Sequence, residues 1–264
     1  MQHISFKQWH RLAVYCGFSA FISYFLAAFA PLPEKISLLF AFAFGPLFML
    51  SSVGLFFVLK HWRDSINLRI AVLFNTVATA MVTMMLVVQV TSQAFHQQFL
   101  AAGRGSVSEE QLKWIFKEVN AVQLGMDLAW DIFISIGTFF FALVMFNHPQ
   151  INKIISILGL IFSVLLLGFN LTYFPEPPSE VGSIDFGPFV AIWYLILFGW
   201  LAIQRSNLIK LSSKTETEEC KPTTKGILPL CPRAVTFAAR SSPADYSVAG
   251  FQLCGISSCS WLTL

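Results

Sequence analysis

The chain has 264 residues, of which 56% are hydrophobic and only 12% are charged. Soluble domains carry roughly twice this charged fraction, so a lipid bilayer must solvate much of the apolar surface of this protein. The net charge of +3 gives no indication of nucleic-acid binding. We therefore expect an all-α membrane protein that contacts the lipid bilayer and binds no nucleic acid.

Six stretches of the chain are apolar over roughly the 20 residues that a helix needs to cross a bilayer. The predicted spans are residues 12–30, 36–59, 70–90, 121–146, 154–174 and 187–203. The first span is too long for the usual core of a cleaved signal peptide, and Pro31 would directly follow the cleavage-like Ala28-Phe29-Ala30. We interpret it as an uncleaved anchor and predict a six-helix transmembrane bundle over residues 1–211.

Two segments carry features that affect helix geometry. Gly45-Pro46 within the second span predicts a kink or a local break. Before the fourth span, Ser108 with Gln111 fits a capping box. We expect either one helix over residues 109–146, roughly 55 Å long at 1.5 Å per residue, or a separate interfacial helix with a bend at Asn120.

The membrane pattern stops near Leu211. Residues 212–225 have the polar, charged composition of a linker, and residues 226–264 have neither a helical nor a strand period. We expect residues 212–264 to be a disordered cytoplasmic tail. It is either a weakly ordered appendage or the product of a frameshift or read-through past a natural end near residue 220.

Lysine and arginine are concentrated on the side of the membrane that holds both termini. That side carries Lys7, Arg11, Lys60, Arg63, Arg69, Lys153, Arg205, Lys210 and Lys214, whereas the other side carries Lys35, Arg104, Lys113 and Lys117. The positive-inside rule therefore predicts that both termini are cytoplasmic.

Four of the five histidines, His3, His10, His61 and His148, fall near the predicted cytoplasmic ends of the spans. A metal or haem site needs ligands that are held together, and no ligand spacing connects these residues. The five cysteines have no zinc-ligand spacing either. We expect interfacial histidines, reduced cysteines, and no metal or other cofactor.

Small and polar side chains recur on one face of three predicted spans. They are Asn75, Thr79, Gln89 and Gln93 on the third span, Gln123, Asp127, Asp131, Ser135 and Thr138 on the fourth, and Ser156, Gly159, Ser163 and Asn170 on the fifth. We call these faces the polar seams. Because small residues let helices approach and polar groups bond between them, we expect the seams to meet inside the bundle.

Two aspartates, Asp127 and Asp131, interrupt the apolar fourth span. One ionised aspartate near the bilayer centre costs about 2.5–3.5 kcal/mol even on a lenient scale, and no lysine or arginine lies within a predicted span to pair with it. Like charges on one helix face also oppose each other's ionisation. We expect Asp131 to be protonated, or water to reach the pair from the outer side. The candidate proton or ion site consists of Asp127, Asp131, Gln123, Gln89, Gln93 and Asn170.

Three classes of function remain open. The first is a non-enzymatic membrane protein whose polar seams are structural, with or without a protein partner. The second is a small transporter or ion-coupled protein that uses Asp127 and Asp131 to move a small solute, ion or proton. The third is a membrane enzyme, for which we find no nucleophile–base pair and expect no catalytic residue. Acids four residues apart on one helix also cannot straddle a scissile bond as an aspartyl protease requires.

Three stretches in the second half of the chain look familiar as an ordered set. DIFISIGTFFFALVMFNHP, ILGLIFSVLLLGFNLTYFPEPP and DFGPFVAIWYL begin at Asp131, Ile157 and Asp185. The set resembles bacterial multi-pass membrane proteins of unknown function, and the resemblance covers roughly residues 1–210. It implies a bacterial inner membrane and implies no particular activity.

Overall fold

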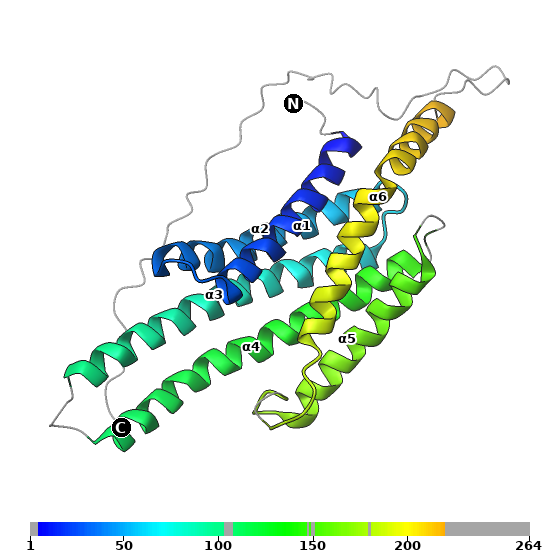
Figure 1. Ribbon diagram of the computed structural model, residues 1–264. Coiled ribbons are helices and arrows are strands. Elements are labelled where there is room, and N and C mark those ends of the chain that lie inside the picture. The colour runs from blue at the N-terminus through cyan, green and yellow to red at the C-terminus, as the bar shows by residue number, and fades with distance from the viewer. Residues whose placement is uncertain (1–4, 103–107, 147, 149–150, 179–180, 220–264) are drawn as a thin grey trace, which may run out of the picture. The chain divides into compact units, whose positions relative to one another are not determined.

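The computed structural model describes residues 5–102, 108–146, 148, 151–178 and 181–219. These residues form the helices α1 (Phe6–Phe29), α2 (Glu34–Lys60), α3 (Ile66–Ala102), α4 (Glu109–Phe146), α5 (Lys153–Tyr173) and α6 (Gly187–Glu219) (Figure 1). All six are long and apolar enough to span a membrane. The expected all-α bundle of six membrane-spanning helices is therefore confirmed.

By its contacts the chain divides into two units, Met1–Thr215 and Glu216–Leu264. The first unit contains the helical bundle. Helix α6 continues to Glu219, past Leu211 where the predicted transmembrane domain ends. The rest of the predicted tail, residues 220–264, lies outside the described residues, so its expected disorder stays a prediction.

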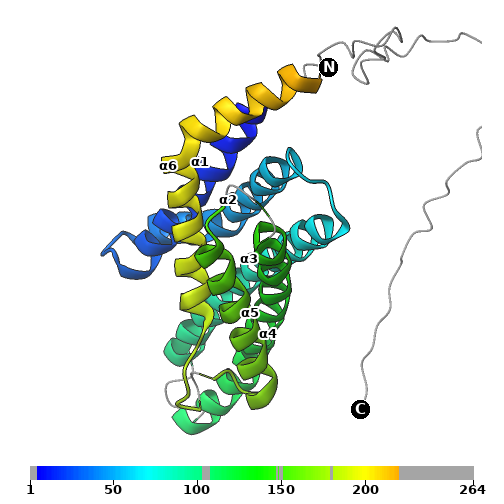
Figure 2. The ribbon, with the colours of Figure 1, turned by 90° about the vertical axis from the view of Figure 1, so that its right-hand side faces the viewer.

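Close backbone packing joins α1 with α2, α2 with α3, α3 with α4, and α4 with α5. Helix α6 lies along one side of these helices, at the front in Figure 1 and at the left in Figure 2. Its buried Trp193, Tyr194 and Phe198 reach into the bundle. A Cβ atom at Gly159 would lie 2.6 Å from the Trp193 ring, and one at Gly17 would lie 2.5 Å from the Phe198 ring. Glycines on α5 and α1 therefore make room for the aromatic side chains of α6.

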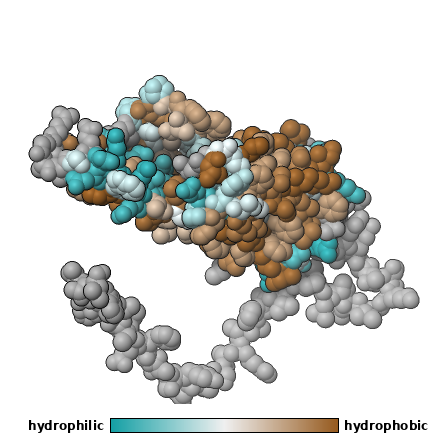
Figure 3. Space-filling view, turned by 90° about the horizontal axis from the view of Figure 1, so that it is seen from below, coloured by the Kyte–Doolittle hydropathy of each residue, from teal (hydrophilic) through white to brown (hydrophobic). Residues whose placement is uncertain are grey.

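Helices α3 and α4 are longer than a bilayer requires. They have 37 and 38 residues, which is about 55 Å each at 1.5 Å per residue, against a hydrocarbon core about 30 Å thick. The two run side by side to the lower left of Figure 1, and hydrophilic side chains gather toward that end of the face in Figure 3. We call this end, residues 91–102 and 109–120, the α3–α4 hairpin end, and it extends beyond the hydrocarbon core.

The long helices α2, α3 and α4 differ in part from the local expectations. Helix α3 extends past the predicted third span of residues 70–90 and continues to Ala102. Residues 109–146 form one helix, so the interpretation with a separate helix and a bend at Asn120 is wrong. The capping box is confirmed, since Ser108 Oγ accepts from Gln111 N at 3.2 Å and Gln111 Oε1 accepts from Ser108 N at 3.3 Å. Helix α2 continues through Pro46, so no local break occurs there.

The start of α1 lies beside the later part of α6. His10 Nε2 donates to Leu201 O across 3.0 Å. The ring of Trp62, in the turn after α2, lies 5.1 Å from Phe6 and 4.9 Å from His148 between centroids. Burial lowers the pKa of His148, which favours its neutral form. The chain therefore begins and leaves the bundle at one end, where aromatic rings fill the space between the helix termini.

Candidate functional site

The α4 and α5 polar seams meet at Asp131 and Asn170. Both side chains are buried, with exposed fractions of 6% and 1%. Asn170 Nδ2 donates to Asp131 Oδ2 at 2.9 Å and to Leu166 O at 3.0 Å. The amide is therefore oriented by its own helix, and it presents a donor to the carboxyl group of the neighbouring helix.

The second carboxyl oxygen of Asp131, Oδ1, has no hydrogen-bond partner among the described residues. The same holds for Ser135 Oγ, one turn along the same face, and for the neighbouring Trp130 Nε1. A buried polar group without a partner costs about 1–3 kcal/mol, so native proteins keep few of them. A run of unpartnered polar atoms therefore lies along α4 next to the Asp131–Asn170 contact.

The charges near Asp131 are negative. Asp127 and Asp185 both lie close enough for their charges to act on Asp131, and Asp131 forms no ion pair with a described lysine or arginine. Asp185 precedes α6, where its Oδ1 accepts from Gly187 N at 2.8 Å. Among the described residues no three His, Cys, Asp or Glu side chains could together hold a metal ion. These three acids consequently lack a compensating cation in the part of the chain that the structure describes.

A separate buried network, which we call the Asn75 node, joins four helices. Asn75 Nδ2 on α3 donates to Ser52 Oγ on α2 at 3.0 Å and lies 2.8 Å from Tyr194 Oη on α6. Tyr194 Oη lies 3.0 Å from Asn75 Oδ1 and 3.1 Å from Thr138 Oγ1 on α4. Every polar side chain of this node has a partner, as expected for a group that holds helices together.

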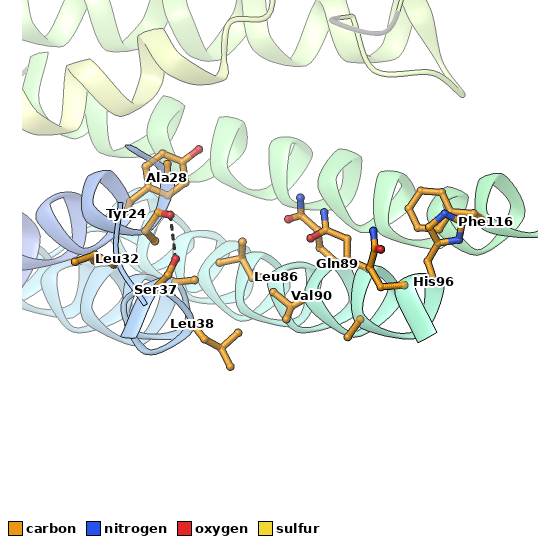
Figure 4. Close-up of a pocket in the computed structure, with 15 residues that line it drawn as sticks. Tyr24, Ala28, Leu32, Ser37, Leu38, Leu86, Gln89, Val90, His96 and Phe116 are labelled. Atoms are coloured by element: carbon orange, nitrogen blue, oxygen red, sulfur yellow. Dashed lines mark hydrogen bonds between the residues drawn. The ribbon is translucent and has the colours of Figure 1, made fainter. Parts of the chain in front are cut away.

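Two of the predicted site residues, Gln89 and Gln93, do not join the acids. They line an open groove of about 870 Å³ together with residues of α1, α2 and α4 (Figure 4). Gln123 and Asp127 are half-buried, and neither side chain hydrogen-bonds a described residue. The structure thus brings Asp131 and Asn170 into contact, leaves Asp127 nearby, and directs the α3 glutamines to a different site.

Sequence reasoning missed Ser52, Tyr194 and Asp185. A tyrosine within an apolar span needs a partner for its hydroxyl group, which was an available signal for Tyr194. Ser52 and Asp185 gave no periodic pattern, because each is a single side chain whose role depends on a neighbouring helix.

Comparisons with protein families, with curated proteins and with solved structures gave no match for this chain. The resemblance to bacterial multi-pass proteins therefore identifies no family. The helices support a multi-pass membrane protein with six candidate spans in contact with the bilayer.

Proposed function

We propose that this is a non-enzymatic membrane protein that binds a proton at Asp131 and belongs to the class of small proton- or ion-coupled transporters. The observation that carries the proposal is the buried Asp131 carboxyl group, which has one oxygen bonded to Asn170 and the other unpartnered. An ionisable residue inside a membrane is a candidate functional site because its charge is costly there.

The described surroundings of Asp131 offer no cation to an ionised carboxylate. Asp127 and Asp185 repel a negative charge at this position, and no described lysine or arginine offsets it. A protonated carboxyl group can accept from Asn170 at Oδ2 and carry its proton on Oδ1. An apolar side chain could fill the position without an unpartnered oxygen, and this supports a role for the acid beyond packing.

For the other contacts of the polar seams, a structural role fits better than proton binding. The Asn75 node is buried, neutral and fully hydrogen-bonded, which supports a role in joining α2, α3, α4 and α6. We therefore assign the two parts of the polar seams to different roles. The Asn75 node holds the bundle together, and the Asp131–Asn170 contact carries the exchangeable proton.

The Asp131→Asn variant should lose the infrared carbonyl band of a buried, protonated carboxyl group. The reason is that asparagine keeps the shape and the contact with Asn170 but cannot bind a proton at this position. The measurement is pH-difference infrared spectroscopy of protein in nanodiscs, and Asp64→Asn is the control, because Asp64 lies in an exposed turn with Arg69 as its partner. If the band survives in Asp131→Asn, or is lost equally in Asp64→Asn, the proton is elsewhere and the proposal fails.

We further propose that the membrane is a bacterial inner membrane and that the start of α1 and the end of α6 both face the cytoplasm; the distribution of lysine and arginine supports this orientation. Single cysteines at the exposed Arg63 and Val181, in a variant whose native cysteines are replaced by serine, test the orientation. In intact cells a membrane-impermeant maleimide should label Val181→Cys and leave Arg63→Cys unmodified. The reverse pattern would contradict this orientation.

A further inference from the structure

The groove beside α3 begins at the level of the connection between α1 and α2 and continues toward the α3–α4 hairpin end. Along α3 it extends from Leu86 to Gln97, which is about 16 Å at 1.5 Å per residue. Its inner end lies against Tyr24 and Ala28, close to the residues where α1 ends and α2 begins. Its outer end lies at the α3–α4 hairpin end, where Phe116 of α4 faces it (Figure 4). The groove therefore lies at the boundary between the hydrocarbon core and the lipid headgroups.

The chemistry of the lining changes along this direction. The inner end is mostly apolar, with Ala28, Leu32, Leu38 and Leu86. The outer part presents Gln89, Gln93 and Gln97, which share one face of α3 because they are four residues apart. No Asp, Glu, Lys or Arg is among the residues that line the groove. Within a single groove, an apolar end is thus followed by a hydrogen-bonding end that presents glutamine amide groups and His96.

An aromatic pair lies at the outer end of the groove. The rings of His96 and Phe116 lie 4.2 Å apart between centroids and are tilted by 34°. They connect α3 to α4 beside the glutamines. Because Gln93 and Gln97 are exposed, their amide groups are open to a ligand that enters from the lipid–water interface.

We propose that this groove binds a membrane lipid whose headgroup is uncharged and rich in hydroxyl groups, with its acyl chains at the apolar end. A glutamine amide both donates and accepts hydrogen bonds, and so does a hydroxyl group. The glutamines of the groove can therefore form hydrogen bonds in both directions with a hydroxyl-rich headgroup. A phosphate headgroup would instead call for arginine or lysine, and the lining has neither. This site does not depend on proton binding at Asp131, and the two proposals can fail separately.

The test is native mass spectrometry of the full chain released from micelles that contain equal amounts of two lipids with identical acyl chains. One is monoglucosyl diacylglycerol and the other is phosphatidylglycerol. The wild type should retain the glucolipid in preference, and Gln93→Leu should weaken its retention about three- to tenfold through a lost hydrogen bond. Gln98→Leu is the matched control, because Gln98 is the same residue type, is exposed on the same helix and does not line the groove.

A second variant examines the apolar end without changing the glutamines. Ala28→Trp places a large side chain at an exposed lining position and should also reduce retention of the glucolipid. Equal retention of phosphatidylglycerol, or equal effects of Gln93→Leu and Gln98→Leu, would overturn the proposal. Full competition by methyl glucoside, which has no acyl chain, would overturn it as well by making the ligand a soluble sugar.

Discussion

Replacing Gly54 with alanine should destabilise the bundle by about 1–3 kcal/mol, the usual cost of overpacking a tight contact. A Cβ atom at Gly54 of α2 would lie 2.6 Å from the backbone nitrogen and 2.8 Å from the Cα of Ala13 on α1. Backbone atoms cannot rotate away as the end of a flexible side chain can. The two helices must therefore separate along an interface that close approach of small residues makes possible.

Gly168→Ala on α5 is the matched control for this substitution. A Cβ atom at Gly168 meets no heavy atom within 4 Å. The gain in helix propensity, up to about 1 kcal/mol, then acts without a steric cost, and this variant should be neutral or slightly more stable. Unfolding by denaturant or heat in one detergent compares both variants. Equal stabilities for Gly54→Ala and Gly168→Ala would mean that α1 and α2 do not approach as closely as described.

Asn75→Leu should cost about 1–2 kcal/mol of unfolding free energy, in the range of interhelical hydrogen bonds measured in membranes. The substitution removes the contacts with Ser52 and Tyr194 together, while the leucine keeps the position filled. Tyr194 Oη retains Thr138 Oγ1 as a partner, which limits the loss. The measurement is equilibrium unfolding in mixed micelles, followed by helical circular dichroism.

Asn67→Leu is the control for the Asn75 node, since Asn67 lies on the same helix and its side chain bonds no described residue. A double-mutant cycle of Asn75→Leu with Tyr194→Phe isolates the contribution of the pair. We expect the double variant to lose less than the sum of the two single losses, because each substitution removes part of the same network. Strict additivity would show that Asn75 and Tyr194 act independently.

The six spans could be predicted because the thickness of the bilayer fixes the length of an apolar helix, whatever its neighbours are. The contact between Asp131 and Asn170 could be predicted in outline, since both residues stand on polar faces of adjacent spans. The length of α3 could not be predicted. Its last turns leave the hydrocarbon core, where packing against α4 and not hydropathy decides how far the helix continues.

The sequence also could not predict that the polar residues of α3 face two different places, the buried node and the groove. Gln89 and Asn75 lie on nearly one face of α3, so periodicity assigns them to one seam. In the structure Asn75 is buried in the node, whereas Gln89 faces the groove shared with α1 and α2. Which helix lies opposite a given turn depends on interhelical angles, and the periodicity of one helix does not encode them.

The way α6 docks has a consequence for biogenesis. Ribosomes synthesise α6 after the five helices that its aromatic side chains contact, so those helices enter the membrane while Asn75 and Thr138 still lack the Tyr194 hydroxyl group. The Ile155 carbonyl oxygen likewise lacks its side-chain donor until α6 is present, when Trp193 Nε1 donates to it at 2.6 Å. Insertion of α6 satisfies these groups together. A nascent chain halted before Gly187 would therefore leave these groups in the membrane without their α6 partners.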